Sequence, residues 1–303
     1  MKRFNDINAL LRKGEAYLVR HSVPNARKNA EWLLVHTLGC GAMDLYLDGD
    51  NHPAPLQVQA YRRLLKRRGD REPLQYIVRS TEFMSESFLA MPGVFIPRPE
   101  TERLVEIVES GIAECKKNGD FKILDLCCGS GAILISLLRR IPGTTGVAVD
   151  IDDAATMLAV KNAELAGMGD RMECVRSDAR AFIMSNPGRF HAVVCNPPYI
   201  CSEEIGSLAP EVRKHEPHLG LDGGEDGLDF YRDTIPFLDW TIETGGMVAF
   251  EIGAGQGKVV SDLLRSAAFE SVKVHHDYSA FERVVTARHA SSVRHRAGGV
   301  TGG

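Results

Sequence analysis

"KILDLCCGSGAILISLLRR", at residues 122–140, places an apolar run, a turn with two glycines and a helical pattern in direct succession. Gly129 and Gly131 carry no Cβ atom, so the main chain of the turn can come close to a bound group. A helix that begins near Ala132 points its unpaired N–H groups at whatever lies above the strand, which favours a polar or anionic group. The turn alone could also be a tight connection without a ligand.

Further short apolar runs follow along the chain and extend this unit into a sheet. The five earlier runs are separated by helical patterns or long segments, as parallel strands require, and the last two are close enough to pair antiparallel. We therefore predict an α/β fold with an open, doubly wound, Rossmann-like, mostly parallel sheet and a reversed edge strand. The runs are KILDL, TGVAVD, MECVRSD, HAVVC, GMVAFEI, VKVHHDY and RVVTARHA.

The first 75 residues have helical patterns instead. In NARKNAEWLLVHTLG (25–39) the apolar residues recur at helical spacing and Gly39 can end the helix, and LQVQAYRRLLKRR (56–68) repeats the pattern. PLQYIVRSTEFMSESFLAMPGVFIPR alternates apolar and polar residues, which suggests a hairpin or an extended connector. We predict a small helical bundle domain over 1–74, a hairpin-like connector over 75–98, a catalytic domain over 99–290 and a disordered tail over 291–303.

The composition is that of a globular protein, with 44% hydrophobic and 25% charged residues among 303. The N-terminus has no apolar stretch of signal-peptide length, and no run is long enough to span a membrane, so we expect a cytoplasmic protein that does not bind membranes. The seven cysteines include no C-x-x-C pair, and the spacing of Cys127, Cys128, Cys195 and Cys201 matches no common metal site. We expect reduced thiols and no metal.

Charge is distributed unevenly along the chain. The net charge is -4, yet residues 1 to 80 carry 14 Lys and Arg against 8 Asp and Glu. The negative net charge of the whole chain does not favour stable nucleic-acid binding. The segment YRRLLKRRGDR (61–71) explains much of the local excess; it predicts either a solvated helix face or a docking surface for an acidic partner.

Asp150 ends the run TGVAVD, 19 residues after Gly131, where an acidic side chain can accept hydrogen bonds from both hydroxyls of a ribose. A cap for the helix that starts near Asp153 is the alternative. The dinucleotide fingerprint G-x-G-x-x-G fails, because Cys127 and Ala132 stand at its first and last positions. The stretch instead resembles the LDLGxGxG motif of class I S-adenosylmethionine-dependent methyltransferases, with Cys127 in place of the first glycine.

The run VVCNPPYIC (193–201) ends a strand with an amide, two prolines and a tyrosine. Proline keeps its carbonyl but has no N–H, so the side-chain oxygen of Asn196 and the carbonyl of Pro197 can act as neighbouring acceptors. Two acceptors suit an NH2 group, and Tyr199 offers a face to a planar substrate. A turn that merely ends the strand is the alternative.

The NPPY motif after such a core resembles adenine-N6 DNA methyltransferases, guanine-N2 RNA methyltransferases and glutamine methyltransferases of release factors. PLQYIVRSTEF, IPRPETERLVE, ILDLCCGSGAI, NPPYI, HEPHLGLDGGEDGLDFYR, EIGAGQG and ERVV occur in the order found in the last group, the HemK/PrmC family. The resemblance implies methyl transfer from S-adenosyl-L-methionine, leaving S-adenosyl-L-homocysteine, to N5 of the glutamine in the Gly-Gly-Gln motif of class 1 peptide chain release factors, which modulates translation termination. The alternatives are an exocyclic amino group of RNA or DNA, or a non-catalytic cofactor-sensing or ribosome-associated binding protein.

The resemblance also implies roles for individual residues. Arg79 stands where the family commonly has glycine, and Ala179 stands where some members have an aromatic residue over the adenine. Residues 199–225 have little periodicity and directly follow the NPPY motif, which favours a lid over the peptide, with mobile filler as the alternative. The resemblance suggests that FIPRPETERLVE lines the cofactor site, and a proline entry with a helix cap is the alternative. The catalytic residues implied are Asn196, Pro197 and Tyr199; the substrate is held by these with Pro198 and Glu216; the cofactor is bound by Cys127, Cys128, Gly129, Ser130, Gly131, Asp150, Asp178, Ala179 and Asn196.

Overall fold

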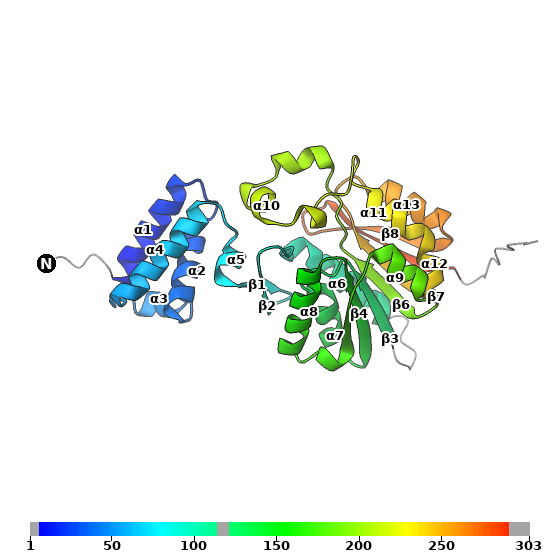
Figure 1. The fold of residues 1–303 in the computed structure, drawn as a ribbon, viewed down its shortest axis with the longest axis horizontal. Helices are drawn as coiled ribbons and strands as arrows, with labels where there is room; N and C mark the ends of the chain where they lie inside the picture. The colour runs from blue at the N-terminus through cyan, green and yellow to red at the C-terminus, as the bar shows by residue number, and fades with distance from the viewer. Residues whose placement is uncertain (1–5, 114–120, 291–303) are drawn as a thin grey trace, which may run out of the picture. The chain divides into compact units, whose positions relative to one another are not determined.

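The computed structural model describes residues 6–113 and 121–290, which divide into two compact units (Figure 1). The helical unit comprises Met1–Thr81, Leu89–Gly93 and Ser207–Glu216, and the sheet unit comprises Glu82–Phe88, Val94–Gly206 and Pro217–Gly303. The helical unit has one buried cluster of apolar side chains, and the sheet unit has two, one on each face of the sheet. The tail predicted over 291–303 lies outside the described residues, and the domain limits drawn from the sequence stay a prediction.

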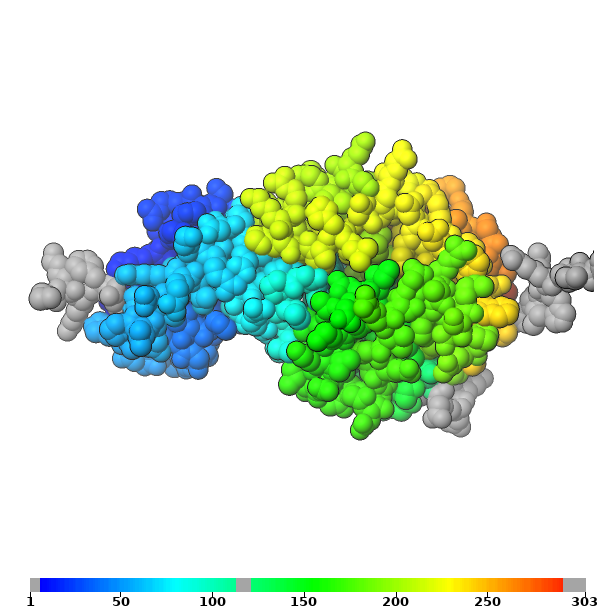
Figure 2. Space-filling model, viewed as in Figure 1, coloured from blue at the N-terminus to red at the C-terminus, as the bar shows by residue number. Residues whose placement is uncertain are grey.

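The helical unit is built on the two amphipathic patterns seen in the sequence. Gly39 adopts a left-handed conformation with φ of 66° directly after α2, so the predicted end of that helix is confirmed. The hydroxyl of Tyr61 donates to the carbonyl of Ala30 over 3.2 Å, which satisfies a buried polar group between α2 and α4. In Figure 2 the atoms of the N-terminal residues, coloured blue to cyan, lie together on the visible face. The helices are α1 (Ile7–Arg20), α2 (Ala26–Leu38), α3 (Asp44–Leu47), α4 (Pro55–Gly69) and α5 (Leu74–Val78).

The basic segment at the end of α4 is partly buried. It is therefore neither entirely exposed to solvent nor entirely available as a docking surface. Arg68 is 5% exposed and donates to Glu211 over 2.8 Å. Arg71 makes two further hydrogen bonds to the same carboxylate, of 2.8 and 2.6 Å. Glu211 belongs to α10 (Pro210–His215), so these ion pairs attach a distant segment of chain to the helical unit.

Two short strands, β1 (Ser80–Phe83) and β2 (Glu86–Leu89), pair within the segment for which the sequence predicts a hairpin or a connector. The residues at the start of that segment form α5 instead. Arg79 ends α5 in a left-handed conformation, with φ of 62°. This conformation explains why glycine suits the position, because a Cβ atom is strained there.

The sheet unit has one seven-stranded sheet in the order β5-β4-β3-β6-β7-β9-β8. Strands β3 to β7 pair parallel, and β9 pairs antiparallel with both β7 and β8. The predicted fold class is therefore confirmed, with the reversed strand β9 one place in from the edge strand β8. The strands are β3 (Phe121–Leu126), β4 (Thr144–Asp150), β5 (Met172–Arg176), β6 (Phe190–Cys195), β7 (Ile242–Glu251), β8 (Phe269–His276) and β9 (Glu282–His289).

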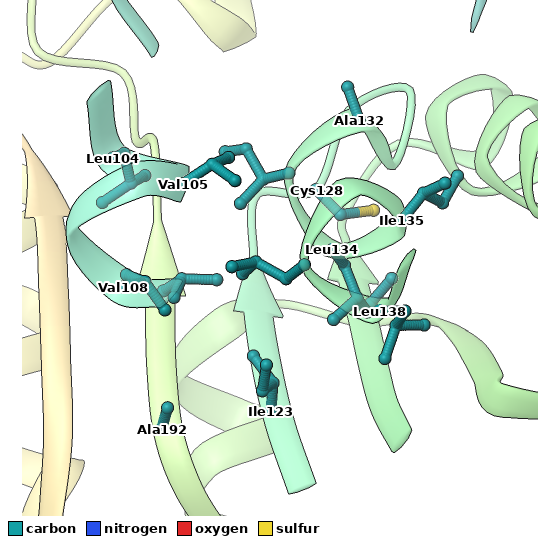
Figure 3. Close-up of a cluster of buried hydrophobic side chains, with 14 of the residues drawn as sticks. Leu104, Val105, Val108, Ile123, Cys128, Ala132, Leu134, Ile135, Leu138 and Ala192 are labelled. Atoms are coloured by element: carbon teal, nitrogen blue, oxygen red, sulfur yellow. The ribbon is translucent and has the colours of Figure 1, made fainter. Parts of the chain in front are cut away.

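Helices cover both faces of the sheet because successive strand residues point to opposite sides. Ile123 of β3 packs with one cluster, which contains side chains of α6, α7 and α8, and Leu124 packs with the other, which contains α9, α11 and α13. Figure 3 shows α6 and α7 over β3 and β6 on the first face. The helices are α6 (Glu102–Ala113), α7 (Ala132–Arg140), α8 (Asp153–Leu165), α9 (Ala179–Ser185), α11 (Asp229–Thr234), α12 (Leu238–Thr241) and α13 (Gly257–Ser266).

The stretch 199–225, which has little periodicity, is nevertheless folded. It contains the 3-10 helix Ser202–Ser207, α10 and the 3-10 helix His218–Gly220, and Ile200 bridges to Asp222. Its role as a lid stays a prediction. Across residues 6–113 and 121–290, no helix combines the length and the apolar character needed to cross a membrane.

Candidate functional site

Four parallel strands end at one edge of the sheet, and each is followed or ended by a polar residue or a turn. Leu126 of β3 is in register with Val149 of β4 and with Cys195 of β6, and Cys195 is in register with Phe250 of β7. The glycine turn, Asp150, Asn196 and Glu251 come directly after these positions. The carboxyl edge of an open α/β sheet is where such folds bind ligands, so this edge is the candidate site.

Three residues of the turn after β3 have a positive φ, and two of them are glycines. Gly131 has φ of 79°, and a Cβ atom there would lie 3.1 Å from the side chains of Ala159 and Met172. Gly129 has φ of 53°, and a Cβ atom on it would meet nothing within 4 Å, so the main chain here is open to a ligand. Cys127 is the exception, since it holds a left-handed φ of 56° with a full side chain.

Asp150 connects this turn to β4. Its Oδ2 accepts from the N–H of Gly129 over 2.9 Å, and its Oδ1 accepts from the N–H of Asp152 over 3.0 Å. Burial raises the pKa of the Asp150 carboxyl. The cap of α8 is Asp152, whose side chain accepts from Ala154 N–H over 2.7 Å, so the cap alternative for Asp150 is wrong. Its carboxylate is available to a hydroxyl-bearing ligand beside the turn.

The NPPY motif is held from several sides. Asn196 donates from Nδ2 to Oγ1 of Thr101 over 3.2 Å, and the hydroxyl of Tyr199 donates to Oε1 of Glu251 over 3.1 Å. The carbonyl of Tyr199 accepts from Nε2 of Gln256 over 3.0 Å. A Cβ atom on Gly227 would lie 2.3 Å from that carbonyl, so only glycine fits beside it. Burial raises the pKa of Tyr199, which keeps its hydroxyl a donor.

Glu251 is the centre of this polar cluster and was not singled out from the sequence. It is 1% exposed, and its Oε2 has no hydrogen-bond partner among the described residues. Burial raises its pKa to about 7, against the lowering effects of Thr101, Arg283 and Tyr199. A carboxyl group at the end of an otherwise apolar strand is costly to bury, and that cost is the signal in the sequence that could have identified it.

Asp125 is a second buried carboxyl group that no motif in the sequence identifies. It lies in β3, is 0% exposed, and neither of its side-chain oxygens has a hydrogen-bond partner in the part of the chain that the structure describes. Burial raises its pKa well above the ordinary value of an aspartate. It lies two residues before Cys127, where the glycine turn begins.

Three further predicted site residues, Asp178, Ala179 and Glu216, lie outside the glycine turn and the NPPY motif. Asp178 follows β5 and caps α9, because its Oδ1 accepts from the N–H of Ala181 over 2.9 Å. Ala179 packs against the apolar cluster of that face, and Glu216, which is 5% exposed, belongs to the helical unit. Their contacts with a cofactor or a substrate stay predictions. Within residues 6–113 and 121–290, no group of three or more His, Cys, Asp or Glu side chains is arranged to hold a metal ion.

Two family models match this chain. The model described as PrmC N-terminal domain matches residues 9–78. The model described as Methyltransferase small domain matches residues 101–212, which include the glycine turn, Asp150 and the NPPY motif. The two matches divide the chain into a helical part and a methyltransferase part.

Several proteins that are similar over most of this chain are named release factor glutamine methyltransferases. A release factor glutamine methyltransferase of Geobacter sulfurreducens is 36% identical over 272 residues, which are 90% of this chain and 93% of that protein. The MTRF1L release factor glutamine methyltransferase of Homo sapiens is 34% identical, over 82% of this chain and 76% of that protein. The solved structure of a release factor-specific protein-(glutamine-N5) methyltransferase from Alicyclobacillus acidocaldarius is 24% identical, covers 64% of this chain and 94% of that chain, and superposes with a TM-score of 0.39.

Proposed function

The chain belongs to the release factor glutamine methyltransferase family, and we propose that it methylates the glutamine of the Gly-Gly-Gln motif in class 1 peptide chain release factors. The methyl donor is S-adenosyl-L-methionine and the acceptor is N5 of the glutamine side chain. The observation that carries the proposal is the similarity to proteins of that name over nine-tenths of the chain. The amide-binding groups at the sheet edge support the same substrate.

The residues at the glycine turn suit the proposed donor. Gly129 leaves its main chain open, α7 begins at Ala132, and the carboxylate of Asp150 accepts from the N–H of Gly129. Asp150 would accept hydrogen bonds from the ribose hydroxyls of a bound donor, and Cys127 to Gly131 would hold the rest of it. When bound, the donor supplies a methyl group activated by a sulfonium. Asp178 and Ala179 are proposed to face the adenine.

The NPPY motif is proposed to hold the glutamine amide. Oδ1 of Asn196 and the carbonyl of Pro197 accept the two N–H groups, which fixes the direction of the nitrogen lone pair. The nitrogen of an amide is a weak nucleophile because its lone pair is delocalised. Acceptors on both N–H groups allow electron density to localise on the nitrogen as the new N–C bond forms and the C–S bond of the donor breaks, and the N–H proton that is released passes to solvent water. Pro198 and Tyr199 support the planar group from the side.

Recognition of the whole release factor is proposed to involve the helical unit. A glutamine side chain alone offers little specificity, and the basic residues of α4 offer a surface of the opposite charge to an acidic partner. Glu216 and the stretch 199–225 are proposed to contact the peptide around the glutamine. The uneven charge of the chain supports this division between a catalytic and a recognition part.

The experiment is methyl transfer to a purified class 1 release factor, with the labelled peptide located by mass spectrometry and total nucleic acid offered in parallel. We expect one labelled glutamine in the release factor and no label in nucleic acid. Asn196→Ala should lower kcat by at least about 100-fold, the size associated with losing a group that stabilises the transition state. Label in nucleic acid alone, or near-normal turnover by Asn196→Ala, would contradict the proposal.

A further inference from the structure

The side-chain amide of Gln256 binds the main chain around the NPPY motif with both of its ends. Its Nε2 donates to the carbonyl of Tyr199 over 3.0 Å and to the carbonyl of Gly227 over 3.2 Å. Its Oε1 accepts from the N–H of Gly253 over 2.9 Å. The orientation of the amide is therefore fixed, because the two carbonyls require a donor and the N–H requires an acceptor. One side chain thus joins the last residue of the NPPY motif to two other loops.

Two glycines make the room that the Gln256 side chain occupies. A Cβ atom on Gly227 would lie 2.6 Å from Nε2 of Gln256, in addition to its clash with the carbonyl of Tyr199. A Cβ atom on Gly253 would lie 3.0 Å from Oε1 of Gln256 and 3.4 Å from the ring of Tyr199. The amide is therefore closely surrounded, and the carbonyl of Tyr199 has little room to turn while Gln256 is in place.

The segment before Tyr199 is stiff, so its direction depends on how its ends are held. The rings of Pro197 and Pro198 fix φ at two successive residues, and a residue that precedes a proline is restricted to extended conformations. Residues 196–198 therefore have few soft torsions. The segment continues β6, which pairs with β7, and it ends at Tyr199. The direction in which the Pro197 carbonyl points is thus set by the sheet at one end and by Tyr199 at the other.

We propose that Gln256 is a positioning residue, which holds the main chain of Tyr199 and thereby directs the Pro197 carbonyl toward the substrate. The inference rests on the proposed function, in which that carbonyl accepts an N–H of the glutamine amide. The side chain of Tyr199 is held from the same turn, because its hydroxyl donates to Oε1 of Glu251 over 3.1 Å. Without the donor of Gln256, the Tyr199 carbonyl loses this hydrogen bond and the stiff segment before it loses a fixed end. The Pro197 carbonyl then no longer keeps one direction.

The first experiment requires neither donor nor substrate. Pro197 and Pro198 are the only adjacent prolines among the 14 of the chain. In protein labelled with 13C and 15N in proline alone, the Pro197 carbonyl carbon is therefore the only one bonded to a labelled nitrogen of the next residue, and a carbonyl carbon–nitrogen correlation spectrum contains this one signal. We expect the signal to move in Gln256→Glu and in Gln256→Met. An unmoved signal in Gln256→Glu would overturn the inference, whether or not the enzyme is active.

The second experiment separates the positioning of Tyr199 from support of the turn at Gly253. Gln256→Glu keeps the shape and an acceptor for the N–H of Gly253, but it faces the two carbonyls with oxygen atoms, whereas Gln256→Met removes both functions. We expect kcat to fall at least about tenfold in both variants, because the amide is no longer held in line with the donor. KM for the release factor should change little, since most of a protein substrate lies away from one amide. Natural kcat in Gln256→Glu with a loss in Gln256→Met would assign the residue to the turn and overturn the inference.

Gln75→Glu is the matched control, because it makes the same chemical change at a half-buried residue of α5. It should leave both the Pro197 signal and kcat unchanged. The Gln256 variants should keep their affinity for S-adenosyl-L-homocysteine, because the hydrogen bonds of the Gln256 amide go to residues other than the glycine turn and Asp150. A loss of that affinity in step with kcat would contradict a role confined to the amide site. Failure of the proposed function has a different signature: the natural protein would not label the release factor, while the Pro197 signal would still move in Gln256→Glu.

Discussion

The main-chain N–H of Gly129 donates a 2.9 Å hydrogen bond to Oδ2 of Asp150, so the turn after β3 is joined to the last residue of β4. One carboxylate therefore both orders the turn and stands beside the ligand it is proposed to hold. The strength of cofactor binding should depend on this side chain more than on any neighbouring acid.

Asp150→Ala should weaken binding of S-adenosyl-L-homocysteine at least about tenfold, because it removes the ribose acceptor and releases the turn; tenfold corresponds to about 1.4 kcal/mol. Isothermal titration calorimetry measures the dissociation constant directly. Asp152→Ala is the control. It removes the cap of α8 and should lower stability by about 1 kcal/mol with little change in affinity. Equal loss of affinity in both variants would argue against a ribose contact.

Glu251→Gln should change how stability depends on pH. Burial raises the pKa of Glu251 from 4.5 to about 7 in the folded protein, so folding favours the protonated form. That contribution is present below about pH 4.5 and is lost as the pH rises toward 7. Relative to the natural protein, the variant should therefore gain stability between these values, by up to about 3 kcal/mol. Chemical denaturation at several pH values tests this, and a constant difference would be inconsistent with a raised pKa.

Glu211→Gln should destabilise the protein by about 3 kcal/mol at pH 7, because it leaves Arg68 buried without its charge partner. Burial works against ionisation of Glu211, but hydrogen bonds from Arg71 and Arg68 prevail and lower its pKa from 4.5 to about 2. The stabilisation is present above about pH 4.5 and is lost as the pH falls toward 2. Thermal unfolding from pH 7 to pH 3 should show the gap between natural protein and variant shrinking only at the acidic end.

Arg79→Gly should stabilise the protein by about 1 kcal/mol, since a left-handed residue with a Cβ atom costs roughly that much. Arg79→Ala removes the same charge and keeps the Cβ atom, so it serves as the control for the electrostatic effect. The melting temperature should rise in the glycine variant alone. A similar rise in both variants would assign the effect to charge.

Arg62 and Arg63 are exposed on α4, unlike Arg68 of the same segment. Replacing both with glutamate should raise KM for the release factor several-fold and leave the affinity for S-adenosyl-L-homocysteine unchanged. The double change Arg62→Gln and Arg63→Gln should have a smaller effect in the same direction. An unchanged KM after charge reversal would exclude this face from docking.

Much of the fold can be predicted from the sequence because it depends on patterns of residues that are close together in the chain. The alternation of apolar residues in β3 to β9, the glycine turn before Ala132 and the strand-ending NPPY motif each reflect rules that act over a few residues. The parallel order of β3 to β7 follows from the long connections between them. The left-handed conformations of Cys127 and Arg79 also match the two positions where the family resemblance implies glycine.

The tertiary structure decided what depends on residues far apart in the chain. Which of Asp150 and Asp152 caps α8, and which faces the turn, depends on how β3 and β4 are aligned. Thr101 and Asn196 are separated by 95 positions, and only the packing of the 3-10 helix Pro99–Thr101 near the end of β6 brings their side chains within hydrogen-bond distance. The sequence by itself determined where β3, β4 and β6 end and that the glycine turn, Asp150 and Asn196 follow or end them, whereas Glu251 at the end of β7 was found only in the folded structure. Folding decided which of them share a hydrogen bond, because those contacts are set by register and burial rather than by neighbours in the chain.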